Sequence, residues 1–269
     1  MAKVVAFSNQ KGGVGKTTTC VNLAAYLALD GYKILLVDFD AQANATSSLG
    51  IFDKKIQNSV YDAMCGYDVS KCIFKSEIDG LDFIPSSLDL CALDKELVGV
   101  QRKEYVLKDV LDKVKSDYDF VFIDCAPSIN MLLVNALCAA DGVIIPLQCE
   151  YLALEGMNQL LNTVRLAKRH LNDSLTVYGV VLTMYTGRSK LSRDVESEIK
   201  NCSEGKFSRR KFHATYGLRK PLATGNPLLY TTTNAQVRLH TTHLQTSLYQ
   251  NLSRSEVWQT QKAALVQKA

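Results

Sequence analysis

The sequence predicts an α/β fold: a doubly wound, mostly parallel sheet with helices on both faces. Two observations predict it. Short runs that are apolar throughout, as in strands buried on both faces, alternate with segments of helical periodicity. The first run also leads through a glycine-rich turn directly into a helical segment. Alternating strands and helices form parallel sheets with right-handed crossovers.

The expected elements follow in order along the chain. The apolar runs predict strands at 3–8, 33–40, 81–87, 119–127, 142–148 and 175–185. Helical periodicity predicts helices at 17–31, where Gly31 is a stop signal, and at 103–116, 129–140, 154–170 and 190–200. We find no internal repeat and no low-complexity linker.

Bulk composition is that of a globular protein. The 269 residues suffice for one large α/β domain or two small ones, and 47% hydrophobic and 22% charged residues are ordinary values. No run of about 18 apolar residues and no basic-then-apolar leader occurs, so we expect a cytoplasmic protein without membrane contact. The eight cysteines form no C-x-x-C pair, which favours reduced thiols over disulfides or a metal site.

The charge is distributed unevenly. Residues 1–200 carry 21 Lys+Arg against 25 Asp+Glu, whereas residues 201–269, called the tail below, carry 10 against 2. The tail also holds three of the four histidines and the single tryptophan. Such a break is typical of a basic nucleic-acid-binding tail, but it has another explanation, given below.

The stretch QKGGVGKTTT at 10–19 joins the first expected strand to the first helix. Gly15, Lys16 and Thr17 close the phosphate-binding pattern G-x-x-x-x-G-K-[ST], although Gln10 stands at its opening glycine. Backbone N–H groups of such a loop, with the helix N-terminus, attract an anion. Lys16 would reach the β- and γ-phosphates and the Thr17 hydroxyl would hold Mg²⁺, whereas the alternative is a turn without ligand. The expected nucleotide-binding residues are Lys11, Gly12, Gly13, Val14, Gly15, Lys16, Thr17 and Thr18.

Three acids stand at the ends of expected strands. Asp38 and Asp40 end the run 33–40 and, two residues apart, face the same side. Asp124 ends the run FVFID, where a carboxylate can hold Mg²⁺ through water. Because ligands bind at the carboxyl edge of a parallel sheet, we expect Thr17, Asp38 and Asp124 around the metal and Asp40 at the attacking water. Solvated strand ends are the alternative.

Five segments carry a specific resemblance to a known family. They are NQKGGVGKTTTCVNLAAYLA, LLVDFDAQANATSSLG, YDFVFIDCAPS, NALCAADGVIIPLQCEYLALEGMNQLLNTV and GVVLTMYTGRSKLS. These resemble the ParA/Soj partitioning ATPases of bacterial chromosomes and plasmids over about residues 1–200. That family belongs to the deviant Walker A class, whose hallmark is the early lysine of the loop.

The resemblance implies roles for single residues. Lys11 would act in trans on the partner subunit's phosphates in an ATP-sandwich homodimer, while Lys16 acts in cis. Asp40 would orient the attacking water, since a carboxyl with a pKa near 4 is a weak base. Two departures from the family leave the acids in place: Ala41 and Ala126 stand where it usually has proline.

The resemblance also implies partners. The family binds DNA non-specifically as the ATP dimer and is stimulated by a ParB-type protein. Arg188 in TGRSKLS is at the position of an arginine used for DNA contact, and Lys190 lies nearby. A solvated helix-start arginine is the alternative. Because residues 1–200 are acidic on balance, any DNA surface must be a local basic patch.

The tail departs from the family. In the family this region continues through a strand, a Pro-Arg-Asn segment that contacts the adenine, a Glu-Ala-Pro-Ser segment and a final helix. The tail instead shows no strand alternation and has two acids in 69 residues. Read one base out of frame, the codons of residues 212–227 can encode Ile-Pro-Arg-Asn-Val-Arg-Leu-Ala-Glu-Ala-Pro-Ser-Tyr-Gly-Lys-Pro, the family's segment in order. A single-base insertion or deletion near residues 200–206 explains this, and a diverged basic tail is the alternative.

The sequence therefore predicts a P-loop ATPase domain at 1–200, a tail at 201–269, and a DNA-partitioning ATPase that uses ATP and Mg²⁺ near the nucleoid. A MinD-like membrane-cycling ATPase is an alternative, with SEVWQTQKAALVQKA as its candidate amphipathic helix. A second alternative is a protein whose altered tail impairs or abolishes ATP hydrolysis. An electron-transfer protein with a bridging cluster ranks last, because Cys91 and Cys125 do not suggest one.

Overall fold

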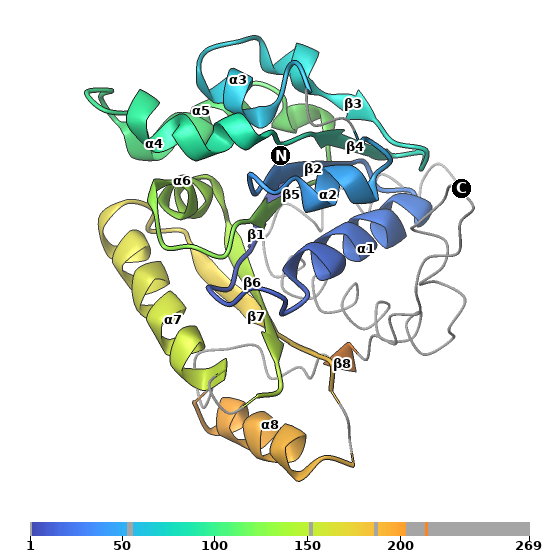
Figure 1. Cartoon of the computed structure of the whole chain (residues 1–269), viewed down its shortest axis with the longest axis vertical. Coiled ribbons are helices and arrows are strands. Elements are labelled where there is room, and N and C mark those ends of the chain that lie inside the picture. Colours follow the sequence, from blue (N-terminus) through green and yellow to red (C-terminus); the bar gives the residue numbers. More distant parts are fainter. Residues whose placement is uncertain (1, 53–55, 151–152, 186–187, 203–212, 215–269) are drawn as a thin grey trace, which may run out of the picture.

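A computed structural model shows one sheet with helices on both faces (Figure 1). It describes residues 2–52, 56–150, 153–185, 188–202 and 213–214. The sheet has eight strands in the order β3-β4-β2-β5-β1-β6-β7-β8. All neighbouring pairs are parallel except β3 with β4. The expected doubly wound α/β fold is confirmed.

The strands lie close to the expected runs. Their bounds are β1 Lys3–Phe7, β2 Ile34–Phe39, β3 Phe74–Lys75, β4 Leu81–Ile84, β5 Phe120–Cys125, β6 Gly142–Gln148, β7 Thr176–Thr183 and β8 His213–Ala214. The sequence analysis did not predict β3 or β8. β8 belongs to the tail and pairs with the end of β7, Leu182 with His213 and Thr183 with Ala214.

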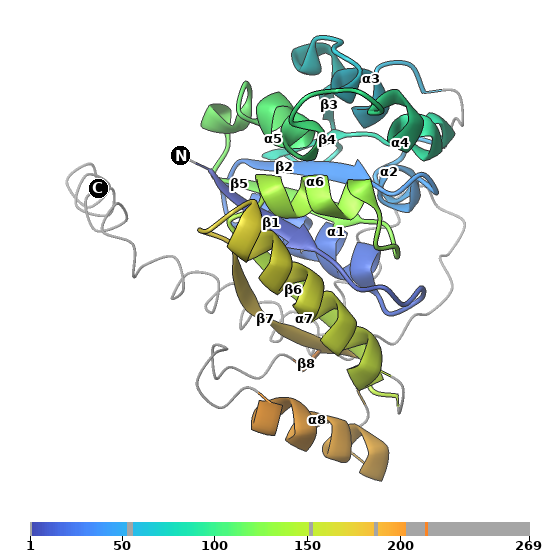
Figure 2. The ribbon, with the colours of Figure 1, turned by 90° about the vertical axis from the view of Figure 1, so that its left-hand side faces the viewer.

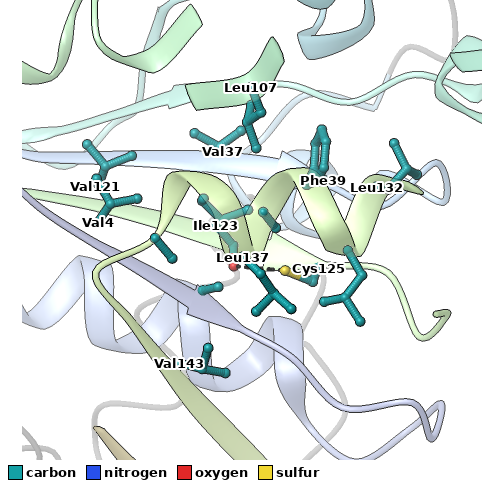
Figure 3. Packing of buried hydrophobic residues seen from close by; sticks show 14 of the residues in the cluster. Val4, Val37, Phe39, Leu107, Val121, Ile123, Cys125, Leu132, Leu137 and Val143 are labelled. Atoms are coloured by element: carbon teal, nitrogen blue, oxygen red, sulfur yellow. Dashed lines mark hydrogen bonds between the residues drawn. The ribbon is translucent and has the colours of Figure 1, made fainter. Parts of the chain in front are cut away.

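Helices cover both faces of the sheet, and alternate strand residues supply the two cores. One face packs against α1 Lys16–Leu29 through Val5 and Phe7, and the other against α6 Met131–Ala139 and α7 Ala153–His170 through Val4 and Ala6. Figure 2 shows α6 and α7 in front of the strands. Figure 3 shows the second core around Val37, Ile123 and Leu137. Strands buried on both faces explain why their sequences are apolar throughout.

The remaining helices are short, apart from the last. They are α2 Asn44–Ser48, α3 Val60–Met64, α4 Leu93–Glu96, α5 Val106–Leu111 and α8 Lys190–Cys202, with 3-10 turns at Val69–Cys72, Leu88–Ala92, Lys103–Tyr105 and Lys115–Asp117. The prediction of a single helix at 103–116 is wrong, because the α-helix in this region spans only Val106–Leu111. Past Leu111 the N–H groups of Lys113 and Val114 bond three residues back rather than four, which ends the α-helix before the chain turns into β5.

Two further expectations concern thiols and membranes. Seven of the cysteines are free thiols in the described part of the chain: Cys20, Cys65, Cys72, Cys91, Cys125, Cys138 and Cys149. The reduced state of the cysteines stays a prediction. None of the helices that the structure describes has the length and apolar character needed to span a bilayer.

Candidate functional site

The glycine-rich loop lies between β1 and α1 at the carboxyl edge of the sheet. Gly13 and Gly15 have φ of 74° and 82°, in the left-handed region that glycine adopts without strain. Gly15 is the N-cap of α1, and a Cβ added there would lie 3.3 Å from Cγ2 of Thr183. The loop therefore requires glycine at this position and directs the helix N-terminus at whatever it encloses, as in phosphate sites.

Hydrogen bonds hold the loop in place. The amide of Asn9 donates to the Pro146 carbonyl (2.7 Å), and its side-chain oxygen accepts the N–H of Lys11 (3.0 Å). From β7, the Thr183 hydroxyl donates to the Val14 carbonyl (2.7 Å). These bonds run to β6 and β7, which flank β1 on one side of the sheet. The loop is therefore preorganised for its ligand.

The two lysines of the loop occupy different environments. Lys16 is buried, and its Nζ donates to the carbonyl of Lys11 (3.0 Å). Burial lowers its pKa, while the charges of Asp124 and Asp40 act in the opposite direction. Lys11 is exposed and forms an ion pair with Glu150, just beyond β6. Lys16 thus points into the site of its own chain, and Lys11 lies at its surface.

Asp124 is a buried carboxylate beside this loop. It lies on β5 in register with Asp38 on β2 and Phe7 on β1, and its exposed fraction is 0%. Neither carboxylate oxygen accepts a regular hydrogen bond from a residue that the structure describes. Burial raises the pKa of Asp124 well above its ordinary value, and the negative charge of Asp38 raises it further. The hydroxyl of Thr17 and the positive charge of Lys16 lower this pKa.

An unpartnered buried carboxylate next to a threonine hydroxyl fits a divalent cation. Buried polar atoms are nearly always satisfied, and an absent ion is one explanation of an exception. Carboxylate and hydroxyl oxygens are hard ligands of the kind that Mg²⁺ prefers. The residues present at Thr17 and Asp124 therefore fit the metal expected from the sequence.

Asp38 has more protein contacts than the sequence analysis expected. One oxygen accepts both the N–H and the hydroxyl of Thr46 (2.7 Å each), and the other accepts the N–H of Asp40 (3.3 Å). The Thr46 hydroxyl in turn accepts the N–H of Ser86 beyond β4 (3.0 Å). Burial raises the pKa of Asp38 to about 6 despite these bonds. Asp38 therefore fastens α2 to the sheet, and direct or water-mediated metal contact stays a prediction.

Asp40 follows β2 and opens the turn to α2. Its Oδ1 accepts the N–H of Gln42 (3.0 Å), and the side chain is largely buried near Lys16. Asp40 and Asp124 thus lie near Lys16, and Asp38 lies beside Asp124 on the adjacent strand, as the strand ends predicted. The proposed orientation of water by Asp40 stays a prediction.

The residues expected to contact DNA lie apart from the loop. Arg188 precedes α8 and Lys190 is its first residue, and both are exposed. In the figures α8 lies beyond the edge of the sheet formed by β7 and β8 (Figure 1). Their DNA-binding role stays a prediction.

Four residues of this site were missed from sequence: Asn9, Thr46, Glu150 and Thr183. Asn9, Glu150 and Thr183 lie at or beyond strand ends on the carboxyl edge, a position that could have suggested them. Their partners lie far along the chain, and residue spacing does not show such pairs.

The fold, the glycine loop and the carboxylates beside it define a P-loop nucleoside triphosphatase. A family model described as an AAA domain matches residues 2–177. The chain is 45% identical over 230 residues to sporulation initiation inhibitor protein Soj of Bacillus subtilis (strain 168), covering 85% of this chain and 91% of that protein. The chain belongs to this AAA-domain family, among the Soj and ParA partitioning ATPases.

Solved structures support the same assignment. Cobyrinic acid a,c-diamide synthase from Mycobacterium smegmatis, with bound ATP analog and magnesium, superposes with a TM-score of 0.73 at 38% identity, covering 76% of this chain and 84% of that one. A putative plasmid partition protein from Borrelia burgdorferi B31 bound to AMPPNP has a TM-score of 0.75 at 26% identity, covering 93% and 100%. Each of these two solved structures contains a bound ATP analogue.

Proposed function

We propose that this protein is a DNA-partitioning ATPase that hydrolyses ATP with Mg²⁺. The observation that carries the proposal is the loop with its two lysines beside the unpartnered Asp124. The relatives add support, since Soj and plasmid partition proteins share the sequence or the fold and one is bound to AMPPNP.

The chemistry is water attack on the γ-phosphate, in which the protein acts by positioning and charge neutralisation. Lys16 and the backbone N–H groups of the loop bind the phosphates. Thr17 and Asp124 would hold Mg²⁺, and Asp38 lies next to Asp124 on the adjacent strand. When bound, the ion would supply positive charge to the phosphate oxygens. Asp40 orients the attacking water. The Lys16 ammonium donates one of its three N–H groups to the Lys11 carbonyl, which leaves two for a phosphate.

Lys11 supports an ATP-bridged homodimer. Its partner Glu150 is as exposed as Lys11 itself, at 42% for each side chain. An exposed ion pair contributes only about 0–1 kcal/mol, so the bond to Glu150 is readily exchanged for a partner subunit's phosphates. We therefore assign Lys11 the trans role, in which each subunit completes the other's site.

The remaining partners follow from the same assignment. The ATP dimer binds DNA without sequence preference through Arg188 and Lys190, which needs only positive charge presented to phosphates. A ParB-type protein stimulates hydrolysis and releases the dimer, and DNA binding places the protein at the nucleoid.

Substitution of Lys11 tests the proposal. Lys11→Ala should reduce steady-state ATP hydrolysis by at least about tenfold and abolish ATP-dependent dimers in light scattering, while a fluorescent ATP analogue still binds the monomer. Lys16→Ala should lose analogue binding itself. Lys95→Ala, an exposed lysine on α4, is the matched control. Unchanged hydrolysis in Lys11→Ala would refute the trans role.

The membrane-cycling alternative is not favoured. Its candidate helix, residues 255–269, lies outside the described residues, and the Bacillus subtilis relative that is 45% identical is a Soj protein. Liposome sedimentation with and without ATP separates the two: ATP-dependent sedimentation with anionic vesicles would support the alternative over partitioning.

A further inference from the structure

Thr183 is a buried junction between the nucleotide loop and the strand that leads to Arg188. It is the last residue of β7 and has an exposed fraction of 0%. Its hydroxyl donates to the Val14 carbonyl at 2.7 Å, across 169 positions of sequence. Its methyl group packs where a side chain on Gly15 would lie. Thr183 thus contacts the two residues that precede Lys16.

The backbone changes direction immediately after this contact. Met184 has φ of 53°, a left-handed conformation that is uncommon for any residue other than glycine. Non-glycine residues in this region persist where surrounding structure enforces them, and they occur at switch regions and ligand sites. The strained Met184 directly follows Thr183, which is fixed to the loop, and precedes the exposed Arg188 by four positions.

The start of α8 is capped by Ser189. Ser189 accepts the N–H of Ser192 on its hydroxyl (3.4 Å) and the N–H of Arg193 on its carbonyl (3.4 Å), as at a capped helix start. Arg188 and Lys190 flank Ser189 and follow Thr183 by five and seven positions. A short chain therefore joins the end of β7 to the basic residues at the start of α8.

We propose that Thr183 couples the nucleotide state of the loop to the DNA-contacting residues Arg188 and Lys190. The Val14 and Gly15 peptides form the part of the loop that encloses phosphate, so phosphate binding adjusts the carbonyl that Thr183 holds. Thr183 transmits this adjustment to the end of β7 and the strained Met184. Thr183 is a positioning residue in this scheme, and the inference rests on the proposed function.

Coupling between two ligands is reciprocal. If nucleotide raises DNA affinity by some factor, DNA raises nucleotide affinity by the same factor. A residue that only supports the loop changes nucleotide affinity equally with and without DNA. A residue that couples the sites changes the ratio of the nucleotide affinity with DNA to the nucleotide affinity without DNA. This ratio therefore distinguishes a coupling residue from one that only supports the loop.

The experiment uses three variants of the full chain. Thr183→Val removes the hydroxyl but keeps the shape of the side chain, and Thr183→Ser keeps the hydroxyl. Thr176→Val is the control: it replaces threonine by valine at the exposed start of the same strand, where the Thr176 hydroxyl donates to the Asp141 carbonyl. Fluorescence anisotropy gives the affinity for a labelled DNA duplex of arbitrary sequence, with and without a non-hydrolysable ATP analogue and Mg²⁺. Analogue affinity is measured with and without the duplex.

In the wild type the analogue should raise DNA affinity. Thr183→Val should reduce this stimulation about fivefold, the effect of one hydrogen bond, while Thr183→Ser and Thr176→Val retain it. Stimulation in Thr183→Val equal to that of the wild type, or analogue affinity lowered equally with and without DNA, would overturn the inference and leave the proposed function standing. A wild type that binds the analogue without any change in DNA affinity would overturn both.

Discussion

Asp38 and Asp124 lie side by side on adjacent strands, both fully buried, and Asp124 lies near Lys16. Two carboxylates in this position cost free energy when no cation is bound, because burial and mutual repulsion disfavour their charged forms. Sequence predicted this pairing, since both acids end apolar runs that form parallel strands. It did not predict that Thr46 occupies one oxygen of Asp38, because that contact depends on where α2 packs.

The first prediction concerns pH. Burial raises the pKa of Asp38 from 3.8 to about 6, so the protonated form is favoured in the folded state. The stability that results is fully present below pH 4 and is lost as pH rises through 6. Relative to Asp38→Asn, the metal-free wild type should lose on the order of 3 kcal/mol of unfolding free energy in all, about 2 kcal/mol of it between pH 4 and pH 6. Urea unfolding of both proteins across this range measures the difference, and a difference independent of pH would contradict the raised pKa.

The second prediction concerns the metal. Asp124→Asn removes the charge that Mg²⁺ would neutralise but keeps the size of the side chain. The variant should unfold at the same or a higher temperature than the wild type without ligand, because an unpartnered buried charge is gone. It should lose most of the additional stabilisation that Mg²⁺ gives to the ATP-bound wild type, as shown by thermal unfolding with ATP in Mg²⁺ or in EDTA. Asp82→Asn, a buried carboxylate outside the site that pairs with Lys75 and Tyr118, is the control. A full Mg²⁺ response in Asp124→Asn would remove Asp124 from the metal site.

At the scale of elements, long periodic segments were predictable and short ones were not. α1, α7 and α8 span 14, 18 and 13 residues, and each was expected within a few residues of its ends. α2 and α3 have five residues each and α4 four, too few for a helical period to be visible. β3 is a two-residue antiparallel edge strand whose pairing with β4 depends on the path of the intervening turn.

The third prediction concerns the packing of β6 against β7. A Cβ on Gly142, at the start of β6, would lie 2.5 Å from the ring of Tyr178 on β7. Gly142→Ala should therefore lower the unfolding free energy by about 1–3 kcal/mol, the usual cost of overpacking. Gly156→Ala is the matched control, since nothing lies within 4 Å of a Cβ there and α7 should gain up to about 1 kcal/mol from alanine. Equal stabilities of the two variants in urea would contradict the packing argument.

At the scale of the whole molecule, the structure describes all of the expected nucleotide site but only a few residues of the tail. Every residue expected to bind phosphate or metal falls in the described part of residues 1–200, and the family model matches residues 2–177. From the tail the structure describes Asn201 and Cys202 at the end of α8 and, in β8, His213–Ala214, paired with the last two residues of β7. The sequence analysis placed the family's adenine-contacting segment at 212–227, and all but two of those residues lie outside the described part.

We propose that the tail is encoded out of frame. Its balance of 10 basic to 2 acidic residues differs from that of residues 1–200, and sixteen consecutive codons at 212–227 can regroup into the family's segment. Sequencing codons 195–230 tests this directly. Arg219, Lys220 and Pro221 should be encoded so that a shift of one base gives Glu-Ala-Pro, and codons that do not regroup would refute the proposal.

The functional consequence can be measured on two proteins, the chain as written and a chain with the frame restored after about residue 200. Both keep the loop, Thr17 and Asp124, so both should bind Mg²⁺ and triphosphate. The restored chain adds the segment that contacts the adenine in the family, and it should bind ATP at least about tenfold more tightly, the effect of about 1.4 kcal/mol of added contact. Inorganic triphosphate, which has no base, should bind the two proteins equally and is the control. Equal ATP affinity in both would show that residues 201–269 supply no contact to the base, in this frame or in the other.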